Sequence, residues 1–461
     1  MPVLPATLGG AGVPAAAASS VPAVALQPAE ARLLADFAPQ DSPARLATLT
    51  MLVGQALAHN AQYQVAMRGV AEARALARMA GAARLPVVAL QAQARRTSFD
   101  NPDLEATERE HYVAAGLALD GDLDIFGRLR AMAQAARERY AGSEQGLAAV
   151  RAGLIAETLR AYSLVVSSRE ALRVLEAHDT DQRRLDAYTA RQFDVGLISR
   201  DQRDAVRAAT LGHHAATVAA ASRYATAQRA LAILTGYAPA SMVDGSDGVA
   251  ALAASPLPLA ALRDLDARIL LDRPDIRQAE AELRARHADI GAARAAFFPS
   301  IHLTTGVGSV SDALGGLFKP GSRAWTFNPA ISLPIFDGGR NQAQLDAAEL
   351  RKDAGVASYA QAIEAAFQEV AGALDQQRAL EAEAAARSER RTLLTRRADA
   401  TAQRVAQGLQ DATELLAERL RTEDAALAHI DAARDLALNR VRLLHAFYGT
   451  AFSLHPSLHQ E

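Results

Sequence analysis

The pattern of apolar and polar positions changes abruptly at Pro299. From Ile276 to Phe297 the chain is built of Ala, Arg, Glu, Leu and Ile, which favour a helix, and Pro274 suits a first helical position because its missing N–H would have no partner there. After Pro299 the period drops to two, with Ile301, Leu303, Thr305 and Val307 on one face and His302, Thr304, Gly306 and Gly308 on the other. The pattern predicts a helix that runs directly into a strand with one apolar face and one small or polar face.

The same join occurs earlier in the chain. Asn60 to Pro86 has the same spacing as Arg273 to Pro299, and further landmarks recur in the same order at an offset of about 210 residues. The other pairs are 123–128 with 333–340, 193–197 with 406–409, and 234–236 with 447–449. Landmarks that recur in register indicate an internal repeat. The chain is predicted to be a tandem duplication of one unit: short helix, helix, two strands, very long helix, glycine turn, helix.

This duplication sets the expected domain organisation. We expect a disordered or extended N-terminal segment over 1–41, an irregular elaboration over 237–258 and a polar C-terminal tail over 450–461. The first repeat covers 42–236, with strands at 87–97 and 111–120 and a long helix at 127–194; the second covers 259–449, with helices at 259–271 and 274–297, strands at 300–310 and 325–333, and a long helix at 340–405. Each long helix would extend about 100 Å. Apolar residues along the first one recur at coiled-coil spacings: Leu147, Val150, Leu154, Ala161, Val165, Leu172 and Leu175.

The composition narrows the possible function classes. The net charge of −3 over 461 residues gives no reason to expect a nucleic-acid partner, which would need a basic face. The absence of cysteine excludes disulfides and thiolate metal sites. No apolar run approaches the eighteen residues of a membrane-spanning helix. A signal peptide and a lipidation cysteine are not seen in this sequence.

The four predicted strands raise the question of what covers their apolar faces. Strands of about ten residues, apolar on one side and small or polar on the other, match those of transmembrane barrels. Four strands cannot close such a barrel, and open edges in lipid would leave backbone groups unpaired, so several copies would have to pool their strands; a trimer would supply twelve. The alternative is a four-stranded sheet that caps a soluble helical bundle. The long helices favour the first interpretation, because a lone helix of this length buries little and must lie against others.

The segments that carry these joins resemble a known family. The stretch from Arg273-Pro274-Asp275-Ile276-Arg277 to Phe298-Pro299-Ser300, the motif 333–340 and its first-repeat counterpart 122–128 are similar to outer-membrane efflux channels (TolC-like, closest to the OprM/NodT type). The resemblance covers about residues 45 to 450. It implies a mainly α fold with a membrane β part: a homotrimer with a twelve-stranded outer-membrane β-barrel and a periplasmic α-barrel tunnel of twelve helices.

The resemblance also implies a function. The family forms the outer-membrane channel of tripartite efflux pumps, a passive exit duct for drugs or other small molecules. Its partners would be a periplasmic adaptor (membrane fusion protein) and an inner-membrane pump, commonly of the proton-driven resistance-nodulation-division (RND) type. The alternative is a soluble or periplasmic coiled-coil scaffold or adaptor, for which a single hairpin and a lipoyl-like domain would be expected. No catalytic set or metal-ligand spacing stands out, so neither an enzyme nor a cofactor is predicted.

Two glycine turns are candidate sites. Val195-Gly196-Leu197 and Gln407-Gly408-Leu409 each break a long helical pattern, and glycine permits the positive φ that a helical hairpin turn needs. By the resemblance, these turns are periplasmic tips that dock the adaptor. The alternative is that they are turns and nothing more.

Three residues after the second turn are candidates for a pore aperture. The family narrows its tunnel there with rings of side chains, and threefold symmetry would convert one carboxylate into a ring that favours cations. Glu414 fits such a ring, together with Asp411 and Thr413. The alternative is a solvated helix face.

Four aromatic residues are candidates for a membrane interface: Phe99, Tyr112, Trp325 and Phe327. Packing inside the trimer is the alternative. The adjacent His213 and His214 resemble a ligand pair, but neighbours on a helix point about 100° apart, so we expect a solvated pair.

Overall fold

The computed structural model describes residues 26–37, 43–101, 106–236, 249–253 and 266–449. The chain splits into two compact units. The sheet unit comprises 67–146 and 275–362, and the hairpin unit comprises 1–66, 147–274 and 363–461. Each unit therefore takes residues from both sequence repeats. The long helices α4 (Arg128–Asp194) and α9 (Arg340–Ala406) contribute residues to both units.

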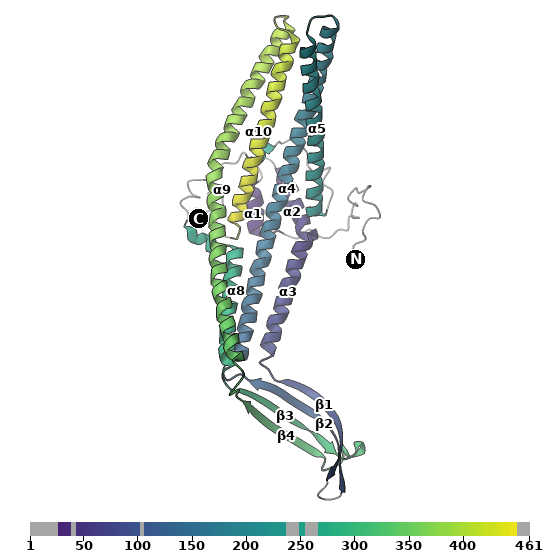
Figure 1. The fold of residues 1–461 in the computed structure, drawn as a ribbon, viewed down its shortest axis with the longest axis vertical. Helices are drawn as coiled ribbons and strands as arrows, with labels where there is room; N and C mark the ends of the chain where they lie inside the picture. The colour runs from purple at the N-terminus through teal and green to yellow at the C-terminus, as the bar shows by residue number, and fades with distance from the viewer. Residues whose placement is uncertain (1–25, 38–42, 102–105, 237–248, 254–265, 450–461) are drawn as a thin grey trace. The chain divides into compact units, whose positions relative to one another are not determined.

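The sheet unit contains one four-stranded antiparallel sheet. Its strands are β1 (Val87–Asn101), β2 (Ala106–Leu123), β3 (Ser300–Ser311) and β4 (Arg323–Ser332), in the order β1-β2-β3-β4 (Figure 1). The helices α3 (Ala61–Ala82) and α8 (Pro274–Ala295) precede the two strand pairs, and the short 3-10 helix η4 (Leu314–Gly316) lies between β3 and β4. Pairing of β2 with β3 joins the strands of the two repeats into one sheet.

The first two strands are longer than the alternation predicted. Pairing of β1 with β2 continues from Arg95 opposite Tyr112 to Asn101 opposite Ala106. Backbone hydrogen bonds hold the ladder together there, although the polar Arg96 interrupts the alternation. The side-chain pattern therefore underestimated the length of both strands.

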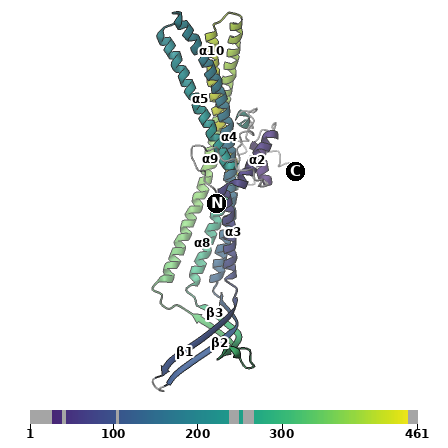
Figure 2. The same ribbon diagram turned by 90° about the vertical axis from the view of Figure 1, so that its right-hand side faces the viewer.

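The hairpin unit consists of two long helical hairpins and shorter helices. In one hairpin α4 is followed by α5 (Arg200–Thr235), and in the other α9 is followed by α10 (Ala412–Ala446); each hairpin ends in a tight turn (Figure 2). The shorter helix α2 (Pro43–His59) lies beside α5. Of the predicted coiled-coil positions, Leu154, Ala161, Val165 and Leu175 are buried, and Leu147, Val150 and Leu172 are half-buried. Among the helices that the structure describes, none is both long and apolar enough to cross a lipid bilayer.

Several helices of the two halves match in length. Helices α4 and α9 each contain 67 residues, and α3 and α8 each contain 22. Both long helices begin directly after a glycine with positive φ, Gly127 at 79° and Gly339 at 84°. Such a φ is rarely adopted by residues with a Cβ, so the glycine landmarks mark equivalent backbone turns in both halves.

The N-terminal segment is partly helical, contrary to the expectation for 1–41. Helix α1 (Pro28–Phe37) lies within it, and the side chains of Glu30, Leu34 and Phe37 are fully buried. A ten-residue helix is marginal in water by itself, so packing against the rest of the hairpin unit stabilises it. A Pro/Ala/Gly-rich composition does not reveal such contacts.

Two other expectations also need correction. Helix α6 (Val249–Ala253) lies within the segment 237–258 that was expected to be irregular, and its Leu252 is fully buried. In the predicted helix 259–271, the described residues form a 3-10 helix, η3 (Ala267–Asp272). Asp266 is its N-cap and accepts a hydrogen bond from the Arg268 N–H at 2.9 Å. The earlier part of that predicted helix lies outside the described residues.

Candidate functional site

The sheet has one strongly apolar face. A row across all four strands joins Leu90, Leu117, Val307 and Trp325, and residues directly opposite each other in a ladder share a face. These four side chains are 78%, 52%, 64% and 76% exposed. The same face also carries Val88, Leu119, Ile301, Leu303, Phe327 and Ile331. Exposed apolar patches of this kind mark sites of contact with lipid or protein.

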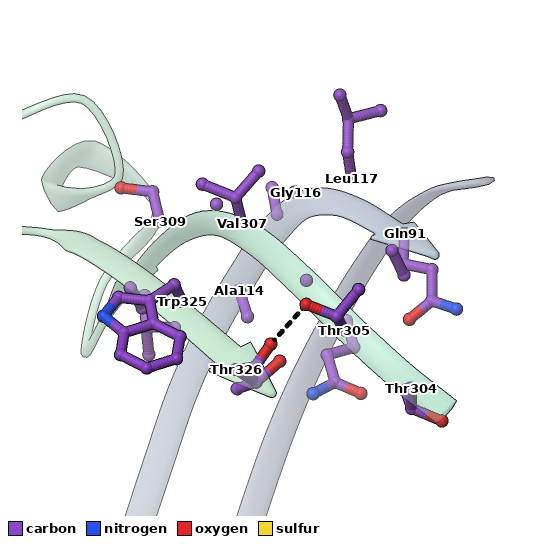
Figure 3. Close-up of a pocket in the computed structure, with 17 residues that line it drawn as sticks. Gln91, Ala114, Gly116, Leu117, Thr304, Thr305, Val307, Ser309, Trp325 and Thr326 are labelled. Atoms are coloured by element: carbon purple, nitrogen blue, oxygen red, sulfur yellow. Dashed lines mark hydrogen bonds between the residues drawn. The ribbon is translucent and has the colours of Figure 1, made fainter. Parts of the chain in front are cut away.

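The opposite face carries small and polar side chains. Its neighbouring row joins Gln91, Gly116, Gly308 and Ala324. A shallow hollow of about 170 Å³ lies in this part of the sheet (Figure 3). An apolar face and a small or polar face on the same strands are what a barrel strand between lipid and an aqueous lumen requires.

Gly116 and Gly308 lie opposite each other where the strands come unusually close. A Cβ on Gly116 would lie 2.6 Å from the Val307 carbonyl oxygen, and one on Gly308 would lie 2.4 Å from the Ala115 carbonyl oxygen. Neither position accommodates a side chain without a backbone shift. Figure 3 shows β3 arching through this region. The glycine pair permits this curvature, which a closed barrel needs.

The two hairpin turns are built in the same way. Gly196 (φ 76°) and Gly408 (φ 73°) both adopt the left-handed conformation. The Leu197 N–H donates to the Gln192 carbonyl, and the Leu409 N–H donates to the Arg404 carbonyl, both at 2.8 Å. This bond and the glycine define a Schellman-type helix end. Because backbone bonds close the turns, their side chains are free to project: Val195, Leu197 and Leu409 are 70%, 72% and 71% exposed, and Gln407 is also exposed.

The helix that follows each turn starts with a different cap. Ser199 and Gln202 form a capping box at the start of α5. Asp411 is the N-cap residue of α10, and its side chain accepts a hydrogen bond from the Thr413 hydroxyl. Glu414 is exposed in the first turn. The three predicted aperture residues therefore lie together at one helix start.

The predicted interface aromatics separate into two groups. Trp325 and Phe327 (62% exposed) lie on the apolar face. Tyr112 lies on the opposite face, where its hydroxyl accepts a hydrogen bond from Gln93 Nε2 at 3.2 Å. Phe99 belongs to β1, but its side chain lies outside the described residues. The alternation of faces thus separates Tyr112 from Trp325 and Phe327.

Known proteins share this architecture. A family model described as "Outer membrane efflux protein" matches residues 52–237 and 267–447. The chain belongs to the outer membrane efflux protein family. It is 37% identical over 331 residues to the solvent efflux pump outer membrane protein SrpC of Pseudomonas putida, covering 71% of this chain and 69% of SrpC. It is 40% identical over 341 residues to outer membrane protein OprJ of Pseudomonas aeruginosa, covering 71% and 68%.

A solved structure of a related channel agrees with the fold. The MtrE outer membrane channel of Neisseria gonorrhoeae, in its open state, matches with a TM-score of 0.73 and 31% identity, covering 87% of this chain and 89% of MtrE. The predicted family, fold class and outer-membrane location are confirmed, as is the role of an efflux channel. The soluble scaffold alternative is not supported.

This efflux protein also contains a buried cluster that the sequence analysis missed. His178 of α4 is 1% exposed, and its Nδ1 lies 3.4 Å from Glu423 Oε2 of α10. The ring of His213 lies 4.0 Å from the His178 ring, so His213 belongs to this cluster, contrary to the expected solvated pair. His214 is exposed, with Nδ1 3.2 Å from Arg183 Nη2. Only long-range packing brings these residues together.

Burial shifts the protonation of this cluster. Burial, followed by repulsion from Asp181 and Asp424, raises the pKa of Glu423 to about 7. Burial and the neighbouring His213 lower the pKa of His178. A neutral imidazole therefore faces a carboxyl group that titrates near neutral pH.

A second buried cluster surrounds Glu30. Arg151 Nη2 donates to Glu30 Oε2 at 2.7 Å, and Arg151 Nη1 donates to the Tyr63 hydroxyl oxygen at 3.0 Å. The Tyr448 hydroxyl donates to Glu30 Oε1 at 2.9 Å. Burial by itself would raise the pKa of Glu30, but the bonds from Arg151, Gln27 and Tyr448 outweigh it and lower this pKa. The cluster ties α1 to α4 and to the segment that follows α10.

Proposed function

We propose that three copies of this chain pool their strands into a twelve-stranded outer-membrane barrel. Their long hairpins would form a periplasmic tunnel, and the assembly would act as the passive exit duct of a tripartite efflux pump. The observation that carries this proposal is the exposed apolar face of a sheet whose outer strands, β1 and β4, are bound on one side only among the described residues.

The sheet edges explain why several copies are needed. In lipid, an unpaired backbone N–H or C=O costs several kcal/mol, and only closed barrels remove such edges. If β1 of one copy pairs with β4 of the next, the free backbone N–H and C=O groups of both edge strands gain hydrogen-bond partners. The apolar face, with Trp325 and Phe327, would then contact lipid, and the face with Gln91 and Thr304 would line the lumen.

The hairpin turns suit docking of a periplasmic adaptor. Each turn presents apolar side chains that no other part of the described chain covers: Val195 and Leu197 in one, Leu409 in the other. We infer that an adaptor binds at both turns and connects the duct to an inner-membrane pump of the RND type. A duct lined by small and polar side chains would pass whatever the pump selects, whether solvents, as the name of SrpC indicates for that relative, or other molecules.

A matched pair of variants tests the barrel. Leu117→Arg places a charge on the apolar face, at a cost of about 2–4 kcal/mol near a bilayer midplane. Ala118→Arg places the same charge one residue away on the lumen face. We expect unboiled outer-membrane fractions to show a detergent-resistant trimer for the wild type and Ala118→Arg, and far less for Leu117→Arg. A soluble monomer for the wild type, or equal loss in both variants, would contradict the proposal.

Asp411, Thr413 and Glu414 are proposed to form the aperture. Threefold symmetry would place three Glu414 carboxylates around the axis, which favours cations. In planar-bilayer recordings, Glu414→Ala should lower the permeability ratio of K⁺ to Cl⁻, and Glu389→Ala, at an exposed position of α9, should not. An unchanged reversal potential in Glu414→Ala would remove Glu414 from the aperture.

A further inference from the structure

The small and polar face of the sheet carries one compact group of charges, here called the lumen cluster. It consists of Asp120 and Asp122 of β2, His302 and Thr304 of β3, and Arg128 of α4. His302 Nδ1 lies 2.8 Å from Asp122 Oδ1, and Nε2 lies 3.0 Å from Asp120 Oδ2. The Thr304 hydroxyl donates to Asp120 Oδ2 at 3.1 Å, and Arg128 Nη2 lies 3.1 Å from Asp122 Oδ2.

The hydrogen bonds determine the charge of His302. A neutral imidazole has one N–H donor, whereas an ionised carboxylate only accepts. Because both ring nitrogens lie against carboxylate oxygens, we assign His302 as an imidazolium that donates from Nδ1 to Asp122 and from Nε2 to Asp120. The cluster therefore balances two negative carboxylates with two positive groups, His302 and Arg128.

The surroundings of the cluster do not change its charge balance, because Asp124 and Arg340, which line the same hollow as Asp122 and Arg128, carry opposite charges. In the same two rows of the sheet, the outer strands present Val87, Asn328 and Ala330. The side chains of His302 and Asp120 are 44% and 52% exposed, so these charges must face water rather than lipid. Ion pairs this exposed contribute little to stability, so balance of charge is the more consequential property of the cluster.

We propose that His302 determines the charge selectivity of the duct at the end of the barrel nearest the helices. This inference rests on the proposed function, because it needs the small and polar face to line a trimeric lumen. In the trimer, each His302 cancels one carboxylate, so that three almost neutral clusters surround the pore instead of a ring of three net negative charges. Such a ring would repel anions. The balanced clusters suit cargo of either sign and uncharged or amphiphilic small molecules.

Opposite charge changes at this cluster test the inference. His302→Gln keeps a hydrogen-bonding side chain but leaves one net negative charge in each copy. Asp120→Asn instead leaves one net positive charge when it is recorded at about pH 5.5, below the ordinary imidazole pKa of ~6.5, where His302 stays protonated with a single carboxylate partner. In planar bilayers holding the full-length trimer under a KCl gradient, we expect His302→Gln to raise the K⁺/Cl⁻ permeability ratio about twofold to fourfold, and Asp120→Asn to lower it by a similar factor. His287→Gln, at an exposed position of α8, is the matched control and should leave the ratio unchanged.

The outcomes separate this inference from the proposed function. If the wild type conducts but His302→Gln leaves the ratio unchanged, or if both variants shift it in the same direction, the inference is overturned and the duct stands. If the wild type forms neither trimers nor conducting pores, the proposed function itself fails, and with it the inference.

Discussion

The two buried polar clusters of the hairpin unit compensate their charges differently. Around Glu30, the carboxylate accepts bonds from Arg151 and Tyr448, and the guanidinium also reaches Tyr63. Around Glu423, the adjacent His178 has a pKa lowered by burial and by His213, and Arg419 offsets only part of the burial and of the repulsion from Asp181 and Asp424. One cluster is a closed network of full charges, and the other holds a carboxyl group whose burial and acidic neighbours outweigh the nearby cation.

This difference indicates different roles in the fold. A buried charge with well-placed partners is costly to disrupt, because removing one partner leaves the other uncompensated. The Glu30 network therefore fixes α1 and the chain segment at Tyr448 to α4. The His178–Glu423 contact joins α4 to α10, that is, one hairpin to the other, and Figure 2 shows these hairpins diverging toward their turns. We infer that the contact between the hairpins is the weaker of the two.

The largest expected change in the free energy of unfolding follows from substitution of Arg151. Arg151→Met would leave the Glu30 carboxylate buried without its cation and should lower the apparent free energy of unfolding by about 3–5 kcal/mol. Chemical unfolding of the detergent-solubilised protein, followed by its helical circular dichroism signal, measures this loss. Arg160→Met on the same helix, which removes a half-exposed pair with Glu157, is the control and should cost about 0–1 kcal/mol. If both variants lose the same amount of unfolding free energy, the buried network is no more stabilising than a surface ion pair.

Substitution of Glu423 is expected to change the free energy of unfolding by a smaller amount, and to increase it. Burial and repulsion from Asp181 raise its pKa from 4.5 to about 7, so the folded protein binds this proton more tightly than the unfolded chain. The resulting cost is present above pH 7 and diminishes as the pH falls toward 4.5. Glu423→Gln should therefore stabilise the protein at pH 8, on the order of 2 kcal/mol, and by much less at pH 5.

The pH dependence separates this explanation from a general effect of removing an acid. The difference in unfolding free energy between the wild type and Glu423→Gln is measured at pH 8 and at pH 5 under otherwise equal conditions. Glu389→Gln, at an exposed position of α9, should show a small and constant difference. If Glu423→Gln is destabilising at pH 8, the carboxylate is better compensated than its surroundings indicate, and the contrast with Glu30 disappears.

Periodicity predicted most of the regular structure. The change of period at Pro299 located β3, and the long runs without Pro located α4 and α9 to within about two residues. Gly196 and Gly408 were recognised as turns because a backbone position with positive φ strongly favours glycine over other residue types. The strand face was predicted from the same alternation, which also placed Trp325 and Phe327 correctly on the apolar side.

Other features of this efflux protein had no local signal. Nothing near Glu30 marks it as buried, because its partner Arg151 lies 121 positions away. His302 was assigned to the small and polar face, yet the carboxylates that charge it lie 180 and 182 positions away. Tyr112 was chosen by residue type alone, and the register puts it on the face opposite Trp325 and Phe327.

The sequence by itself determined the repeat, the long helices, the glycine turns and the two-faced strands, because each depends on spacings of a few residues along one element. Only the tertiary structure decided that β2 pairs with β3, that α1 is a helix, and which buried acids have a cation beside them. These properties depend on contacts between residues far apart in the chain. For a buried charge these contacts determine whether it is stable, because its free energy away from water depends on the groups that surround it.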